Sequence, residues 1–87
     1  GPSVRRALLL KAAETLASRA PDFFAAMSAE LGAGQLWVGA NIELARKILL
    51  EAAAMTTQVV GETLPTDQTG VWSLSLREPA GVVLGIA

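Results

Sequence analysis

The hydrophobic period of the chain changes at Gly61, and this change constrains the fold more than any other feature. Before Gly61, apolar residues recur every three or four positions, which is the spacing of an amphipathic helix. After it, Trp72, Leu74 and Leu76 alternate with polar residues, which is the spacing of a half-buried strand. Helices followed by strands predict an α+β arrangement.

Two long helical segments are expected before this change. The first runs from Val4 to Ala20 and continues, after a kink at Pro21, to Leu31. Gly32 is a natural stop for it. Its predicted buried stripe consists of Leu9, Ala13, Leu16, Ala20, Phe24, Met27 and Leu31.

The start of the second helical segment is open between two alternatives. Asn41 would cap a helix that begins at the next residue. Alternatively, the helix begins near Gln35 and carries Trp37 and Asn41 inside it. From either start it is expected to reach about Val60. Its predicted buried side consists of Ala45, Ile48, Leu49, Ala52, Met55 and Val59.

The last part of the chain is expected to form strands. A turn at residues 67–70 leads to the alternating stretch Val71–Leu76, and residues 79–81 break it. The run Gly81–Ala87 is apolar and uncharged, as in a parallel strand that helices cover on both faces. Nothing in the 87 residues supplies that cover, so we expect the chain to be a truncated piece of a larger protein.

Composition excludes several kinds of site. Cysteine, histidine and tyrosine are absent, so no thiol nucleophile, serine–histidine–aspartate triad or ordinary zinc site is possible. We predict no catalytic residue and no metal ligand. Seven basic residues are scattered at a net charge of −1, so no nucleic acid partner is expected. No apolar stretch reaches membrane-spanning length and no signal-peptide pattern is present, so the expected location is cytoplasmic, with no membrane contact.

Gly32, Gly34 and Gly39 do not match a dinucleotide-binding loop, because the spacing differs and a helix, not a strand, precedes them. Trp37 allows two interpretations: a core side chain between helices, or the aromatic wall of a pocket. Trp72 is expected to pack against a neighbouring layer.

Three stretches resemble the N-terminal part of an aldehyde dehydrogenase: RRALLLKAAETLASRAPDFFAAMSAELGA, AMTTQVVGETLPTD and SLREPAGVVLGIA. They are most similar to the aromatic branch, which acts on salicylaldehyde, vanillin and benzaldehyde. The resemblance implies one unit, residues 1–87, from the cofactor-binding and oligomerisation region, ending in the first strand of a Rossmann-like domain. It also implies oxidation of an aldehyde with NAD or NADP. Since the family's cysteine nucleophile and glutamate base lie outside these residues, the chain alone is expected to be inactive and to bind no cofactor.

The resemblance also implies roles for single residues. Trp37 matches a tryptophan that lies against the substrate ring, and Ala40 stands where the branch commonly has a second aromatic. Ile86 and Ala87 match positions beside the adenosine half of the cofactor. Residues 72–76 match the strand that joins subunits, so a homo-oligomer is expected. The alternative hypothesis is a small helical interaction domain without catalysis, which self-associates through its apolar stripes and strand edge.

Overall fold

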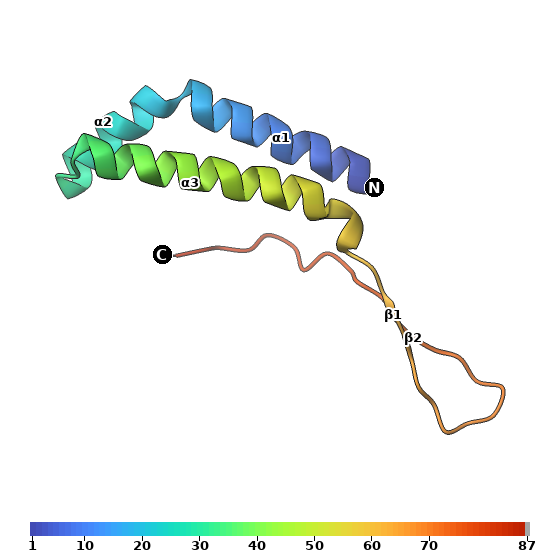
Figure 1. Ribbon diagram of the computed structural model, residues 1–87. Coiled ribbons are helices and arrows are strands. Elements are labelled where there is room, and N and C mark those ends of the chain that lie inside the picture. Colours follow the sequence, from blue (N-terminus) through green and yellow to red (C-terminus); the bar gives the residue numbers. More distant parts are fainter. Residues whose placement is uncertain (87) are drawn as a thin grey trace. The chain divides into compact units, whose positions relative to one another are not determined.

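The computed structural model describes residues 1–86, and within them helices precede strands, as predicted (Figure 1). The elements are α1 (Pro2–Ser18), α2 (Ala20–Leu31), α3 (Gln35–Ala54), a 3-10 helix η1 (Met55–Gln58), β1 (Glu62–Leu64) and β2 (Ser73–Ser75). The chain divides into two compact units, Gly1–Thr57 and Gln58–Ala87, with the boundary at the end of η1. The predicted α+β class is therefore confirmed, with three α-helices in place of two long helical segments.

α1 and α2 are separate helices that meet at Arg19, which leaves the helical conformation with φ −101° and ψ 15°. Pro21 lies in the first turn of α2, where its missing N–H breaks no helical hydrogen bond. α2 ends as predicted at Gly32, which adopts the left-handed conformation with φ 62°.

α3 begins at Gln35, so the second of the two predicted starts is confirmed and the predicted cap at Asn41 is wrong. Asn41 lies inside the helix, where its side-chain nitrogen Nδ2 donates to the carbonyl oxygen of Trp37 at 2.9 Å. The predicted end near Val60 is also wrong. The α-helix ends at Ala54, and the hydroxyl of Thr56 donates to the carbonyl oxygen of Ala53 at 3.0 Å. Such a hydroxyl competes with the backbone for helical acceptors, which favours the tighter turn that follows.

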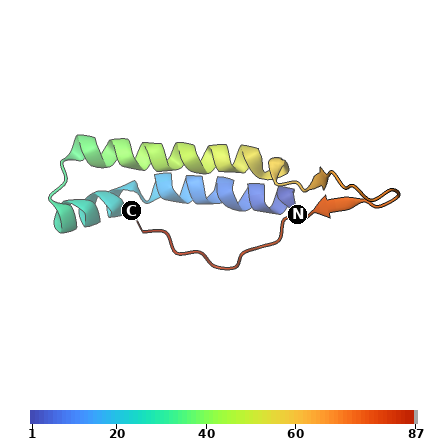
Figure 2. The ribbon, with the colours of Figure 1, turned by 90° about the horizontal axis from the view of Figure 1, so that it is seen from below.

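The core of the first unit lies between α1 and α3, which run side by side (Figures 1 and 2). Its fully buried apolar residues are Ala13 of α1 and Val38 and Ala53 of α3, at most 2% exposed. The predicted stripe is confirmed for Leu9, Ala13 and Leu16 of α1 and for Ala20, the first residue of α2, which are all buried or half-buried. The predicted continuation through α2 holds for Phe24 and Met27 but not for Leu31, which is exposed.

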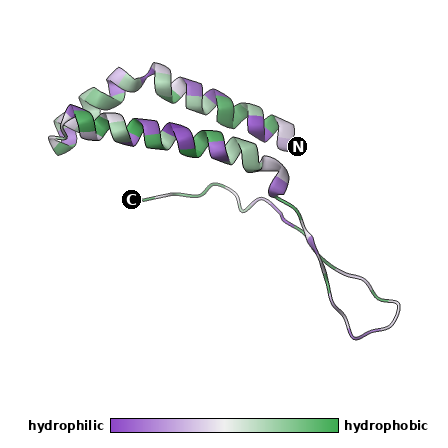
Figure 3. Ribbon diagram, in the orientation of Figure 1, coloured by the Kyte–Doolittle hydropathy of each residue, from purple (hydrophilic) through white to green (hydrophobic). Residues whose placement is uncertain are grey.

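The predicted buried side of α3 is largely wrong. Ala45, Ile48 and Met55 are exposed, and Val59, beyond the end of η1, is exposed as well. The side that faces the core is rotated about the helix axis and consists of Val38, Ile42, Arg46, Leu49 and Ala53, all buried or half-buried; Thr56 of η1 is buried as well. Figure 3 shows why the pattern is ambiguous, since green hydrophobic residues and purple hydrophilic ones are interleaved along the whole of α3.

The second unit is an antiparallel pair of strands. Glu62 pairs with Ser75, Thr63 with Leu74 and Leu64 with Ser73. β2 lies within the predicted strand, whereas β1 was not predicted. Residues 81–86 are not assigned to a strand, contrary to prediction. A strand requires a neighbour to complete its ladder of hydrogen bonds, and no described segment pairs with this one.

Candidate functional site

The predicted substrate-binding residues, Trp37 and Ala40, lie one turn apart in the N-terminal half of α3, and both are exposed. The indole of Trp37 is 65% exposed. Trp37 is therefore not a core side chain of this unit, and the first of its two interpretations is wrong. The large flat ring is free to contact a partner outside the unit.

Trp37 is one of four large apolar side chains that form a row along α3 and onto the start of η1. The row, called here the outer stripe, consists of Trp37, Leu44 and Ile48 of α3 and Met55 of η1, all exposed. Their spacings of seven, four and seven positions are close to whole turns of a 3.6-residue helix, so the side chains lie in line. The buried residues Val38 and Ala53 fall on another side of the helix. α3 therefore has two apolar faces, of which only one is covered within its unit.

Ala40 lines an open hollow of about 430 Å³ together with Phe24, Gln35, Leu36 and Gly39. The hollow exists because two consecutive small residues of α3 lie opposite the ring of Phe24. A Cβ on Gly39 would lie 3.6 Å from the Phe24 atom Cζ, which is an ordinary contact distance. Trp37 is not among the lining residues, so the two predicted site residues are near each other on α3 but do not share one cavity.

Sequence reasoning did not single out Leu44, which the structure adds to the candidate surface. Leu44 follows Trp37 by two turns and Ala40 by one, so the three residues lie along one side of the helix. Its 57% exposure marks it as uncovered within the unit. Spacing alone could have grouped it with Trp37, but only the structure shows that this side does not face α1.

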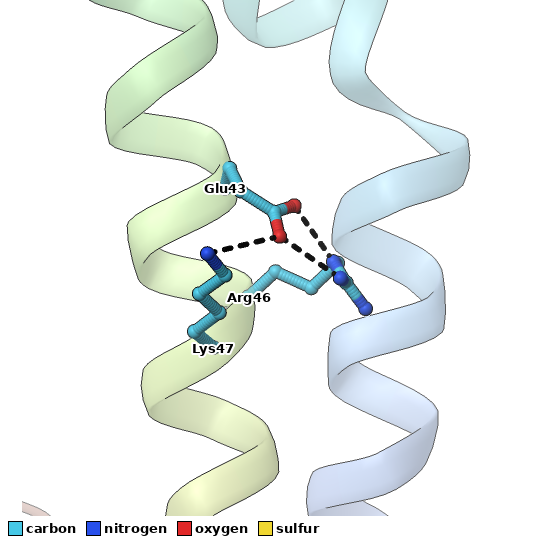
Figure 4. Close-up of polar contacts among 3 residues, drawn as sticks. All are labelled: Glu43, Arg46 and Lys47. Carbon is cyan, nitrogen blue, oxygen red and sulfur yellow. Dashed lines mark hydrogen bonds and ion pairs between the residues drawn. The ribbon is translucent and has the colours of Figure 1, made fainter.

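Glu43, Arg46 and Lys47 form a charged cluster beside this region (Figure 4). The guanidinium of Arg46 donates two hydrogen bonds to the Glu43 carboxylate, from Nε at 2.9 Å and from Nη2 at 3.0 Å. Nζ of Lys47 lies 3.8 Å from the same carboxylate.

The pKa of Glu43 is lowered, chiefly by the Arg46 hydrogen bonds; desolvation opposes this, and the positive charges of Arg46 and Lys47 assist it. The pKa of Arg46 is correspondingly raised, first by its hydrogen bonds to Glu43. A general base works best when its pKa is near the operating pH. The carboxylate of Glu43 is instead held ionised by two cations, which makes it a poor general base near neutral pH.

Among residues 1–86, no three acidic, histidine or cysteine side chains gather where they could hold a metal ion. Within the same range, no helix has the length and apolar character needed to cross a membrane.

The predicted cofactor-binding residues lie at the end of the second unit. Ile86 is in an irregular segment and is 88% exposed, and Ala87 lies outside the described residues. Trp72 is 84% exposed, so the layer against which it was expected to pack is not provided within this unit. Leu74 and Leu76, which follow it in the alternating stretch, are exposed as well.

Comparisons with known proteins relate the whole chain to one protein family. The model of the aldehyde dehydrogenase family matches residues 1–87. The chain is 45% identical to a salicylaldehyde dehydrogenase of Pseudomonas putida and 52% identical to a vanillin dehydrogenase of Pseudomonas fluorescens, each over 86 residues. These alignments cover 99% of this chain but 18% of each relative.

A solved structure is similar as well. The crystal structure of a salicylaldehyde dehydrogenase from Pseudomonas putida G7, complexed with salicylaldehyde, matches with a TM-score of 0.80 and 46% identity. The match covers 91% of this chain and 16% of that one. The chain therefore spans less than a fifth of the length of the relatives that it matches.

Proposed function

We propose, because this chain belongs to the aldehyde dehydrogenase family, that the complete protein oxidises an aromatic aldehyde to its carboxylic acid with NAD or NADP. The observation that carries the proposal is the 45–52% identity, over 86 residues, to enzymes named for salicylaldehyde and vanillin. Both compounds are aromatic aldehydes. The aldehyde carbon would lose a hydride to the nicotinamide, and water would supply the second oxygen of the acid.

The contribution of this segment would be to bind the substrate ring. Trp37, Ala40 and Leu44 offer an exposed, largely apolar wall on one side of α3. An exposed indole stacks on an aromatic ring in an offset or edge-to-face arrangement, and such pairs add to the gain from burial. Ala40, being small, leaves room beside the indole for a substituted ring.

The reacting groups would come from other parts of the protein. The chain contains no cysteine, so these residues do not supply the thiolate that attacks the aldehyde. Glu43 is bound by Arg46 and Lys47 and would not act as the base that activates water.

The described residues do not by themselves fit a dinucleotide. A dinucleotide cradle needs a glycine turn between a strand and a helix N-terminus, whereas Gly32 and Gly34 lie between α2 and α3. The role of Ile86 and Ala87 beside the cofactor therefore depends on residues beyond those described, and we derive no catalytic step from it.

Residues 72–76 would contribute to contacts between subunits of a homo-oligomer. Trp72, Leu74 and Leu76 are exposed and alternate along the chain, so they lie on one face of the hairpin. An exposed apolar face beside unpaired strand edges favours association with another sheet.

The test is to measure NADH or NADPH formation by the full-length protein with benzaldehyde, and to compare Trp37→Ala. Wild type should oxidise benzaldehyde, and the variant should lose about tenfold in kcat/KM, the size expected for a lost aromatic pair. Phe23→Ala, which removes an exposed aromatic side chain of α2, serves as a matched control and should not reproduce this loss. Absence of aldehyde oxidation in wild type would refute the proposed function.

A further inference from the structure

Asn41 is the one polar residue placed within the apolar side that carries Trp37 and Leu44. It lies four positions after Trp37 and three before Leu44, and residues at these spacings are neighbours on a helix surface. Asn41 is half-buried, whereas Trp37 and Leu44 are exposed. A polar group in this position would contact a ligand that covers the apolar side.

The side chain of Asn41 is oriented by the helix itself. Its Nδ2 donates to the carbonyl oxygen of Trp37 at 2.9 Å, and within residues 1–86 this is the only hydrogen bond of the side chain. The amide group is planar, with nitrogen and oxygen on separate branches. When the nitrogen faces the Trp37 carbonyl, the oxygen Oδ1 is turned away from it and keeps its two acceptor lone pairs.

An acceptor that a bound ring would cover is selective. An apolar wall binds benzaldehyde and hydroxybenzaldehydes with little discrimination, because a hydroxyl adds little bulk. A site that accepts a hydrogen bond from the hydroxyl discriminates more strongly, because the acceptor is left unpaired with the unsubstituted ring.

We propose that Asn41 is a specificity-determining residue, whose Oδ1 accepts a hydrogen bond from the ring hydroxyl of a hydroxylated aromatic aldehyde bound against Trp37. The inference rests on the proposed function and deepens it by naming the substrate class. The two roles of the amide are complementary. The nitrogen fixes the orientation of the side chain, and the oxygen accepts the hydrogen bond from the substrate hydroxyl.

The experiment compares the full-length enzyme with Asn41→Leu, which removes the acceptor at similar size, and with Asn41→Asp, which keeps an acceptor oxygen but loses the nitrogen. The substrates are benzaldehyde and its 2-, 3- and 4-hydroxy derivatives. The measured quantity is the ratio of kcat/KM for the best hydroxylated substrate to kcat/KM for benzaldehyde. Gln58→Leu, an exposed amide outside α3, is the matched control.

Asn41→Leu should lower this ratio about tenfold, the usual effect of losing one hydrogen bond to a substrate. Asn41→Asp should retain most of the preference, and Gln58→Leu should not alter it. A ratio that stays constant in Asn41→Leu overturns the inference, even if overall activity falls. A loss of preference in Asn41→Asp equal to that in Asn41→Leu also overturns it, because the bond to Trp37 would then be what matters.

Circular dichroism of each variant establishes that α3 is retained. If the wild-type enzyme oxidises benzaldehyde but prefers no hydroxylated ring, the inference fails while the proposed function stands. If wild type oxidises none of the four aldehydes, both fail.

Discussion

Gly61 allows the two backbone segments of the hairpin to approach each other closely next to β1. A Cβ at this position would collide with the carbonyl oxygen of Ser75. The neighbouring amide of Glu62 donates to the hydroxyl of the same serine at 3.0 Å. The close approach of the two backbones, which only glycine permits, therefore lies next to the first paired residue of the hairpin.

Gly61→Ala should weaken the β1–β2 pairing by roughly 1–3 kcal/mol, because the backbone must move to accommodate the methyl group. Hydrogen exchange of the amides of residues 62–64 would measure the change. Gly85→Ala is the control, since nothing lies within 4 Å of a Cβ there and its φ is not positive. Equal exchange rates in the two variants would contradict this account of Gly61.

The ion pairs of Glu43 should make the stability of the fold depend on pH. Its pKa is lowered in the folded chain, so the ion pairs contribute stability above the unfolded value, which is about 4.3. That contribution is lost as the pH falls through the lower folded value. Thermal unfolding can be followed by circular dichroism at a series of pH values from 6 down to 2. The melting temperature should fall more steeply with decreasing pH in wild type than in Glu43→Gln. Parallel curves would mean that the contacts with Arg46 and Lys47 do not stabilise the fold.

At the scale of elements, α1 could be predicted from the sequence and α3 only in part. Along α1, the stripe that begins with Leu9 and Ala13 is the one that faces the core. Along α3, two stripes of similar hydrophobicity coexist, and periodicity cannot say which one faces α1. Similarly, β1 has three residues, too few to establish an alternation, and it forms because Thr63 and its neighbours pair with β2.

The candidate site, like α3, could be predicted from the sequence only in part. Trp37 and Ala40 came from a family resemblance, and their exposure agrees with a contact surface. Leu44 and Asn41 could not be assigned to that surface before the orientation of α3 was known, because Asn41 also fits the pattern of a helix cap.

The two sides of α3 should respond differently to truncation. Val38 is fully buried, so Val38→Ala should cost about 2 kcal/mol through lost burial and a residual cavity. Ile48→Ala removes more atoms, but from an exposed position, and should cost less than about 0.5 kcal/mol in the isolated chain. Chemical denaturation followed at the helical circular dichroism signal would measure both. A larger loss for Ile48→Ala would mean that the outer stripe is covered.

At the scale of the whole molecule, exposed apolar surface is the dominant feature. The outer stripe and residues 82–84 leave many large side chains without cover inside their own units. A self-associating interaction domain would also account for this surface. It would not account for the similarity of 99% of the chain to enzymes of one family.

The isolated 87-residue chain should associate in a concentration-dependent way, because contiguous exposed apolar residues with strand-forming character are aggregation sites. Val83→Lys combined with Leu84→Glu should reduce this association while leaving helix content unchanged. Light scattering across a concentration series measures the effect. A sharp monomer peak for wild type at high concentration would contradict it.

Two of the three fully buried apolar residues of the first unit are alanines, Ala13 of α1 and Ala53 of α3. A larger side chain at either position would displace its neighbours, because packed interiors have few voids. Enlarging either one would tilt α3 and, with it, the plane of the Trp37 indole. Under the proposed role of Trp37, changes at these two buried positions would alter substrate preference from a distance.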